Sequence, residues 1–176
     1  MLKRILFIGL GGAGQRHLRL FKKKLDGKNV EFIAYRSTNK TPLLNPDFSI
    51  NKDSTIESYY RVKTYDNLHK ALDLKPNLVV ISTASSTHLK YAQICAENGI
   101  NILVEKPLSN STYGVQKLIK TIERNKVALR VGLQRRFHTH IKRVKEIVLS
   151  GGIGKILNAN FTVASFIPRW HPYEDF

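Results

Sequence analysis

The fold of this chain is decided by residues 3–21, KRILFIGLGGAGQRHLRLF. The run from Ile5 to Ile8 is short and apolar, which is typical of a strand buried on both faces of a sheet. Residues 9–14 follow at once and fit the pattern G-x-G-x-x-G. Beyond them, small and apolar residues recur at the spacing of one helical face: Gly14, Leu18, Phe21 and Leu25. The stretch therefore predicts a strand, a tight glycine turn and a helix.

The glycines of this turn have predicted tasks in holding a dinucleotide. Gly9 permits the tight turn, Gly11 lets the backbone approach a pyrophosphate, and Gly14 lets the helix pack closely on the strand. The phosphates are expected on the amides at the positive end of the helix dipole, with Gly12 and Ala13 among them. The sequence thus predicts a dinucleotide-binding Rossmann domain, and the alternative is a glycine-rich turn without a ligand.

Outside this unit, apolar runs and helical patterns alternate along the chain. Further strands of a parallel sheet are predicted at residues 30–34, 78–81, 100–104 and 127–131, with a short additional strand at 62–65. Helices are predicted around residues 14–25, 68–72, 89–95 and 115–122. This alternation indicates a doubly wound α/β sheet. Residues 37–61, polar and without periodicity, are expected to form a surface excursion.

The end of the second strand bears on the choice of cofactor. Enzymes that use NAD usually carry an acidic residue there, roughly 20 residues past the glycines, for the ribose hydroxyls. This chain has Arg36 and Ser37 instead. Arg36 can pair with a 2′-phosphate, and Ser37 can donate a hydrogen bond to it. The absence of a carboxylate removes the usual repulsion of that phosphate, so the sequence predicts a preference for NADP. In the alternative, Arg36 is merely exposed and both cofactors are accepted.

Two later strand ends are expected to border the cofactor crevice, because ligands of open α/β sheets bind beyond the carboxyl ends of the strands. Thr83, Ser85 and His88 follow the strand at 78–81, and Glu105-Lys106-Pro107 follows the strand at 100–104. A lysine at such an edge can hold an anionic oxygen or lower the pKa of a substrate hydroxyl. For Glu105 and Lys106 alone, a surface ion pair is the competing interpretation.

The pattern changes after Gly132. Residues 137–148 predict an amphipathic helix that ends at Gly151-Gly152, and residues 157–163 alternate between apolar and polar side chains, which predicts a strand with one wet face. We therefore expect a dinucleotide-binding domain at residues 1–132 and the start of a second α+β domain at 133–176. Because a single strand cannot satisfy its own hydrogen bonds, this second domain is expected to be incomplete, as in the front part of a longer protein.

Composition narrows the class of protein. The single cysteine, Cys95, lies in a helical apolar pattern and is interpreted as core filler in a reducing, cytoplasmic compartment. No metal site is predicted, because the six histidines lack ligand spacing and His138 and His140 should point to different sides of a helix. No run approaches the about 20 apolar residues of a membrane helix. The net charge of +16 is scattered, so we interpret it as solvated faces and attraction to an anionic ligand rather than a nucleic-acid surface.

Four motifs in this order resemble the Gfo/Idh/MocA family of glucose-fructose oxidoreductases and inositol dehydrogenases. They are residues 9–14, residues 83–88, Glu105-Lys106-Pro107, and residues 131–137 followed by 151–156. The resemblance runs over nearly the whole chain. It implies an enzyme that moves a hydride between NADP or NAD and a carbon of a sugar, nucleotide sugar or cyclitol.

The resemblance also implies roles for individual residues. Lys106 would lie by the nicotinamide and the substrate as the catalytic candidate, and Glu105 would line the cofactor pocket. The family's threonine and histidine map onto Thr83 and His88, and its next strand end maps onto Gln134 and Arg135. Residues 170–172, Trp-His-Pro, would lie near the substrate.

The chain departs from the family at one point. The catalytic histidine of the family belongs to an Asp-x-Gly-x-His type of segment, which does not occur before Phe176. We therefore expect this polypeptide to bind a cofactor but to turn over poorly, and we expect a homo-oligomer only for the full-length protein. Two functions stay open: the front part of a sugar-type oxidoreductase, or a noncatalytic dinucleotide-binding module or remnant of a truncated gene.

Overall fold

The computed structural model describes residues 2–38 and 40–166. These residues form two compact units with their boundary between Gly132 and Leu133. Among the described residues, no helix has the length and apolar character that crossing a membrane requires.

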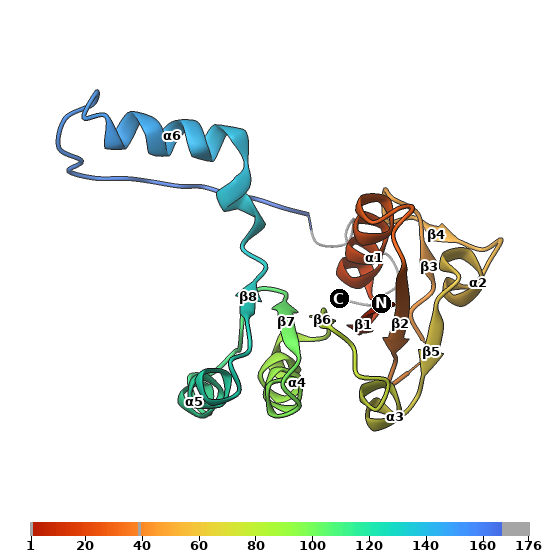
Figure 1. The fold of residues 1–176 in the computed structure, drawn as a ribbon. Coiled ribbons are helices and arrows are strands. Elements are labelled where there is room, and N and C mark those ends of the chain that lie inside the picture. The colour runs from red at the N-terminus through yellow and green to blue at the C-terminus, as the bar shows by residue number, and fades with distance from the viewer. Residues whose placement is uncertain (1, 39, 167–176) are drawn as a thin grey trace. The chain divides into compact units, whose positions relative to one another are not determined.

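The first unit is built on a six-stranded sheet whose adjacent strands are all parallel (Figure 1). The strands are β1 (Lys3–Ile8), β2 (Val30–Tyr35), β5 (Lys63–Tyr65), β6 (Leu78–Ile81), β7 (Asn101–Val104) and β8 (Leu129–Val131). Their spatial order is β5-β2-β1-β6-β7-β8, so the direction of winding reverses between β1 and β6. The predicted doubly wound sheet is confirmed, and the short strand expected at 62–65 is its edge strand β5.

Helices cover both faces of this sheet. The helices α1 (Gly12–Lys24) and α2 (Ile56–Tyr60) contribute to one apolar core, and α3 (Leu68–Leu72), α4 (Ser85–Glu97) and α5 (Val115–Asn125) contribute to the other (Figure 1). Strand β1 serves both, because Leu6 and Ile8 belong to the α4 side while Ile5 and Phe7 belong to the α1 side. Period-two alternation of apolar residues thus gives a strand with no wet face.

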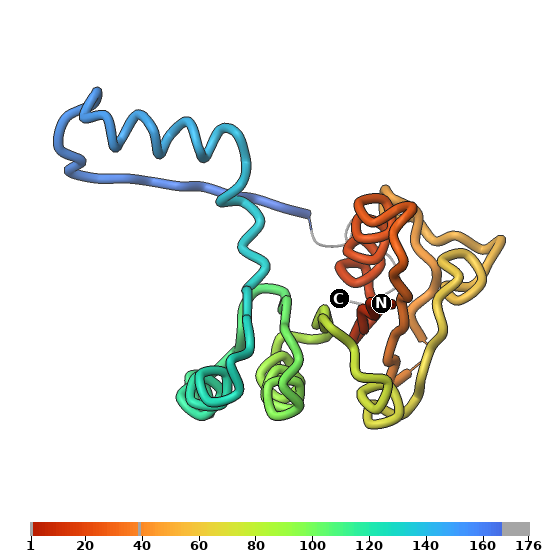
Figure 2. The backbone as a smooth tube through the Cα atoms, in the orientation of Figure 1, coloured from red at the N-terminus to blue at the C-terminus, as the bar shows by residue number. Residues whose placement is uncertain are grey.

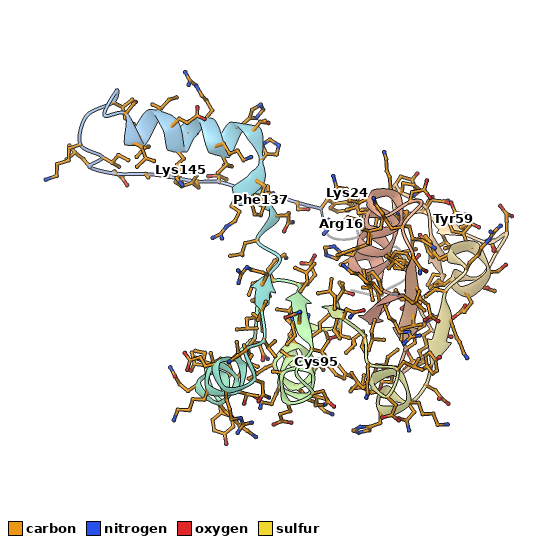
Figure 3. The ribbon with its side chains drawn as sticks, in the orientation of Figure 1. Arg16, Lys24, Tyr59, Cys95, Phe137 and Lys145 are labelled. Carbon is orange, nitrogen blue, oxygen red and sulfur yellow. The ribbon has the colours of Figure 1, made fainter. Side chains whose placement is uncertain are left out.

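Cys95 lies in the core on the α4 side, as predicted (Figure 3). The side chain is fully buried, and burial raises the pKa of its thiol to about 12. The thiol is therefore protonated at neutral pH, which fits core filling and not reactivity.

The surface excursion at residues 37–61 contains an antiparallel hairpin of β3 (Leu43–Leu44) and β4 (Ile50–Asn51), followed by α2. Gln15 of α1 is fully buried and ties this hairpin to the glycine turn. Its Nε2 donates to the carbonyl oxygens of Leu10 at 3.0 Å and Pro42 at 2.8 Å, and its Oε1 accepts from the Leu44 N–H at 2.8 Å. One buried amide side chain therefore satisfies three backbone groups, those of Leu10, Pro42 and Leu44.

Arg19, four residues further along α1, holds the other part of the excursion. Its Nη1 donates to the Leu44 carbonyl oxygen at 3.2 Å and to the Tyr60 hydroxyl at 2.9 Å. Ile56 and Tyr60 of α2 are themselves buried against this face. The excursion is thus fixed to α1 and to its side of the sheet.

The second unit contains a 3-10 helix, η1 (Gln134–Phe137), and helix α6 (Thr139–Leu149). Gly151 has φ +72° directly after the Ser150 cap, so the predicted left-handed end of this helix is confirmed. His138 precedes α6, and its ring lies 4.9 Å from that of His140, so the expectation that a helix separates the two side chains is wrong. Phe137 and Lys145 lie on this unit (Figure 3).

The strand expected at residues 157–163 does not form. Within residues 40–166, no strand is assigned after β8, and the segment runs as an extended trace with exposed side chains (Figure 2). The alternation of side chains is present, but no strand of the described part of the chain offers the backbone hydrogen bonds that a sheet needs.

We predict that Gln15→Ala lowers the free energy of unfolding by about 2–4 kcal/mol, because it strips buried backbone groups of their partner. Chemical denaturation followed by circular dichroism measures the change. Lys23→Ala, at an exposed position of the same helix, is the control and should stay within about 0.5 kcal/mol of the wild type. Equal stability of the two variants would contradict the tie between α1 and the excursion.

Candidate functional site

The predicted site residues of the first unit lie at the carboxyl edge of its sheet. Gly9 follows β1, Arg36 and Ser37 follow β2, Thr83 follows β6, and Glu105 and Lys106 follow β7. The backbone ladder continues past the strand ends, with the Gly9 N–H donating to the Tyr35 carbonyl oxygen at 3.1 Å and the Ser82 N–H to that of Ile8 at 2.9 Å. The reversal of winding between β1 and β6 makes this edge the place where open α/β sheets hold ligands.

Two glycines set how closely α1 approaches that edge. A Cβ added to Gly14 would lie 2.3 Å from the Gly9 carbonyl oxygen and 2.7 Å from Ser82 Oγ. Gly9 has φ +88°, and a Cβ there would lie 2.8 Å from Thr83 Cγ2. No other residue type fits at either position without moving backbone, which agrees with the predicted turn and close packing of helix on strand.

The amino end of α1 suits an anion. Gly11 caps the helix in an extended conformation, φ −69° and ψ −170°, without a side-chain hydrogen bond, and the first turn has no acidic residue. Gly12, Ala13 and Gly14 form that first turn, while Lys22, Lys23 and Lys24 lie in the last turn, where cations oppose the helix dipole. The glycine turn thus fits the pyrophosphate of a dinucleotide both sterically and electrostatically.

The loop after β6 lies against the glycine turn. Ser82 Oγ donates to the Gly9 carbonyl oxygen at 2.9 Å. Thr87 Oγ1 donates its one proton to the Ala84 carbonyl oxygen at 2.8 Å. Thr83 Oγ1 is therefore the donor in the 2.7 Å hydrogen bond between the two threonines. The lone pairs of Thr83 Oγ1 are therefore left as acceptors beside Gly9.

His88 links two loops of the site from beneath. The ring is buried, with Nδ1 2.7 Å from the Pro107 carbonyl oxygen and Nε2 2.9 Å from that of Thr83. It lies in the first turn of α4 and spans the loops that follow β6 and β7. A role of His88 in cofactor binding would therefore act through the position of these loops.

Glu105 joins the end of β7 to α1 across the switch point. Its Oε1 accepts from His17 Nε2 at 2.7 Å and from Arg16 Nη2 at 3.2 Å, and its Oε2 accepts from the Lys106 N–H at 3.1 Å. The hydrogen bond from His17 holds the pKa of this carboxyl below its ordinary value, against the effect of burial. Arg16 lies on α1 in Figure 3.

The competing interpretation of Glu105 and Lys106 as a surface ion pair is wrong. The Glu105 carboxylate is buried and takes its side-chain partners, Arg16 and His17, from α1, while Lys106 meets it through the backbone N–H alone. The Lys106 side chain is exposed, and the Lys106-Pro107 peptide bond is cis. Lys106 is therefore available to a ligand at this edge.

Arg36 differs from expectation. Its guanidinium is buried, with Nη1 donating to Glu57 Oε1 at 2.7 Å and Nη2 to the Thr41 carbonyl oxygen at 2.9 Å. The sequence argument for NADP assumed that no carboxylate lies near this residue, and that assumption is wrong, because α2 supplies one. The alternative of a merely exposed Arg36 is wrong for the same reason.

The remaining predicted residues are not part of this network. Ser37 is exposed beyond β2, and Ser85 is the first residue of α4. Gln134 opens η1 of the second unit, which is described separately. Residues 170–172 lie outside the described residues.

Sequence reasoning missed three residues that shape the site. Arg16 and His17 follow the glycine turn directly, and the spacing of three from Gly14 to His17 on one helical face was a usable signal. Glu57 gave no such signal, since it comes from the irregular excursion and not from the end of β2.

Two other features contribute nothing to this edge. A pocket of about 350 Å³ lies between α4 and the loop into α5, lined by Lys90, Tyr113, Lys117 and neighbours, but by none of the predicted site residues. Among residues 2–38 and 40–166, no group of three or more His, Cys, Asp or Glu side chains could hold a metal ion.

Comparison with protein families identifies one match. A family model named GFO_IDH_MocA and described as "Oxidoreductase family, NAD-binding Rossmann fold" matches residues 3–133. The myo-inositol 2-dehydrogenase of Thermotoga maritima is 33% identical over 95 residues, which cover 53% of this chain and 28% of that protein. The rhizopine catabolism protein MocA of Rhizobium meliloti is 30% identical over 154 residues, 87% of this chain and 44% of that protein.

Solved structures share the fold. The myo-inositol 2-dehydrogenase of Lactobacillus plantarum superimposes with a TM-score of 0.71 at 24% identity and covers 89% of this chain and 43% of its own. The WlbA dehydrogenase of Bordetella pertussis, solved with NADH and UDP-GlcNAcA, gives 0.72 at 20% identity, with 89% and 44% covered. The chain thus spans less than half the length of these relatives.

We predict that Glu105→Gln lowers the free energy of unfolding at pH 7 by about 1–3 kcal/mol, because the partly buried donors Arg16 and His17 on α1 lose a charged acceptor. The pKa of Glu105 is lower in the folded than in the unfolded chain. Its contribution is therefore complete above the ordinary glutamate value of about 4.3, shrinks as the pH falls, and is gone below the folded value. Denaturation from pH 7 to pH 3 should show the two proteins converging in acid, and a constant difference would count against this assignment.

Proposed function

This chain belongs to the Gfo/Idh/MocA oxidoreductase family, and from that membership we infer that it binds a nicotinamide dinucleotide at the carboxyl edge of its sheet. We propose that the whole protein transfers a hydride between this cofactor and a hydroxyl-bearing carbon of a sugar, nucleotide sugar or cyclitol. The observation that carries the proposal is the contact of Gly9 and Gly14, which brings the amino end of α1 to the switch point.

The first task of the chain is to hold the pyrophosphate. Amides of the turn from Gly11 to Ala13 lie at the positive end of α1, and no acidic side chain of the first turn opposes an anion there. Thr83 Oγ1 gives its proton to Thr87, so it offers a ligand only acceptor lone pairs and does not itself donate to the pyrophosphate. When bound, the nicotinamide ring supplies the hydride donor or acceptor.

The second task is to orient groups around the reacting carbon. Glu105 is occupied by His17 and Arg16, so it fixes the end of β7 and is poorly placed to act as a free base. The next residue, Lys106, has an exposed ammonium group. This group can hold the oxygen of a substrate hydroxyl and favour loss of the hydroxyl proton. Lys106 is thus the proposed catalytic residue of this chain, with Glu105 and His88 as positioning residues.

The proposed substrate class rests on the named relatives. Two of those above are inositol 2-dehydrogenases, and another was solved with a nucleotide sugar. A polyhydroxylated small molecule is the property that these substrates share. Residues 133–176 are proposed to begin the domain that binds it, and any homo-oligomer is proposed for the whole protein.

We predict that Gly11→Asp separates folding from cofactor binding. The conformation of Gly11 is open to aspartate, whose carboxylate would cap α1 and change stability by only about a few tenths of a kcal/mol. The same carboxylate occupies the amides meant for the pyrophosphate, so the affinity for NADH should fall about a hundredfold. Fluorescence titration of the chain with NADH measures this loss.

The control for that variant is Asn29→Asp, which adds one negative charge just before β2, at the opposite edge of the sheet. Its affinity should match the wild type. If the wild-type chain binds neither NADH nor NADPH, the proposed function is wrong.

Hydride transfer is tested separately on the whole protein. Reduction of the cofactor in the presence of myo-inositol, sugars and nucleotide sugars is followed by absorbance, and Lys106→Met should lower kcat about a hundredfold or more with little change in cofactor affinity. Cofactor binding without turnover of any of these compounds would favour a noncatalytic binding module.

A further inference from the structure

The end of β2 is where this fold meets the adenosine ribose. The Tyr35 carbonyl oxygen accepts from the N–H of Gly9 at 3.1 Å, so the residues after Tyr35 lie beside the glycine turn. In Rossmann domains an acidic side chain there binds the ribose hydroxyls of NAD, or an arginine accommodates the 2′-phosphate of NADP. This chain places both kinds of group at that position.

Arg36 is not a free cation. The residue is 8% exposed, and its two terminal nitrogens are held by Glu57 Oε1 at 2.7 Å and by the Thr41 carbonyl oxygen at 2.9 Å. A 2′-phosphate could reach this guanidinium only by sharing it with a carboxylate or by displacing that carboxylate.

Glu57 is ionised and faces solvent in part. Burial, the largest influence, raises the pKa of this carboxyl, but bonds from its own backbone N–H, Arg36 and Thr64 together hold it below the ordinary value. The side chain is 37% exposed. A negative charge therefore stands against the Arg36 guanidinium, although the sequence at the end of β2 contains no acidic residue.

The pair has a definite consequence for cofactor choice. Arg36 and Glu57 together are neutral, so the attraction for a 2′-phosphate is cancelled while the carboxylate repels it. The 2′-hydroxyl of NAD carries no charge and can donate a hydrogen bond to a carboxylate. We propose that Glu57 is the cofactor-selecting residue of this chain and that it selects NAD(H) over NADP(H).

This inference rests on the proposed function, because it requires that a nicotinamide dinucleotide binds. The role of Glu57 in cofactor selection can be tested separately from folding. Helix α2 is held independently of Glu57, by the buried side chains of Ile56 and Tyr60, by Arg19 on the Tyr60 hydroxyl, and by Thr55 Oγ1 accepting from the Ser58 N–H at 3.1 Å. Removing the charge of Glu57 should therefore leave the helix in place.

The experiment is a fluorescence titration of the wild-type chain and Glu57→Gln with NADH and with NADPH at pH 7 and fixed salt. The wild type should bind NADH more tightly. In Glu57→Gln the ratio of the two Kd values should shift toward NADPH by about tenfold or more, since the repelling charge is gone and the guanidinium is released. The gain should disappear in the double variant Arg36→Gln/Glu57→Gln.

Glu31→Gln is a matched control. Glu31 lies in β2 near the opposite edge of the sheet, its side chain is also 37% exposed, and it is also paired with an arginine, Arg4. This variant removes the same charge at the far end of β2 and should leave the ratio unchanged.

Two results would overturn the proposal: a wild-type preference for NADPH, which needs no variant to detect, or a Glu57→Gln ratio equal to that of Glu31→Gln. Both are distinct from a failure of the proposed function, in which the wild type binds neither cofactor.

Discussion

The site depends on one steric constraint, the contact between the start of α1 and the ends of β1 and β6. At Gly14 a single added carbon would lie 2.3 Å from the Gly9 carbonyl oxygen, far closer than van der Waals contact allows. Residue 14 must therefore be glycine if α1 is to lie where it does. That placement aims the helix dipole at the switch point and determines which loops the following side chains can reach.

Three consecutive residues of α1 contact different parts of the first unit. Gln15 turns inward and satisfies the backbone of the excursion, while Arg16 and His17 reach the Glu105 carboxylate at the end of β7. Because successive residues of a helix are separated by about 100° around its axis, one turn can serve both sides. The glycine turn, the excursion and the loop bearing Lys106 are thus held by a single element.

Sequence reasoning predicted the parts of the molecule governed by local pattern. The apolar alternation of β1, the glycine spacing and the left-handed Gly151 are each fixed by a few neighbouring residues, and each was found. It failed where partners are remote. Glu57 lies 21 residues from Arg36, in a segment without periodicity, so no sequence spacing predicts that the two side chains pair. The alternation at 157–163 was real, but a strand also needs a neighbour, and a pattern within one segment cannot supply it.

Two parts of the first unit lie beside the site: the glycine turn, and residues 37–61, which side chains of α1 hold in place. The contact between Gly9 and Gly14 leaves no room for a side chain, whereas residues 37–61 are attached by side chains of α1 and carry Glu57 near their end. Substitutions in that segment can therefore change the charge beside Arg36 without altering the contact between Gly9 and Gly14.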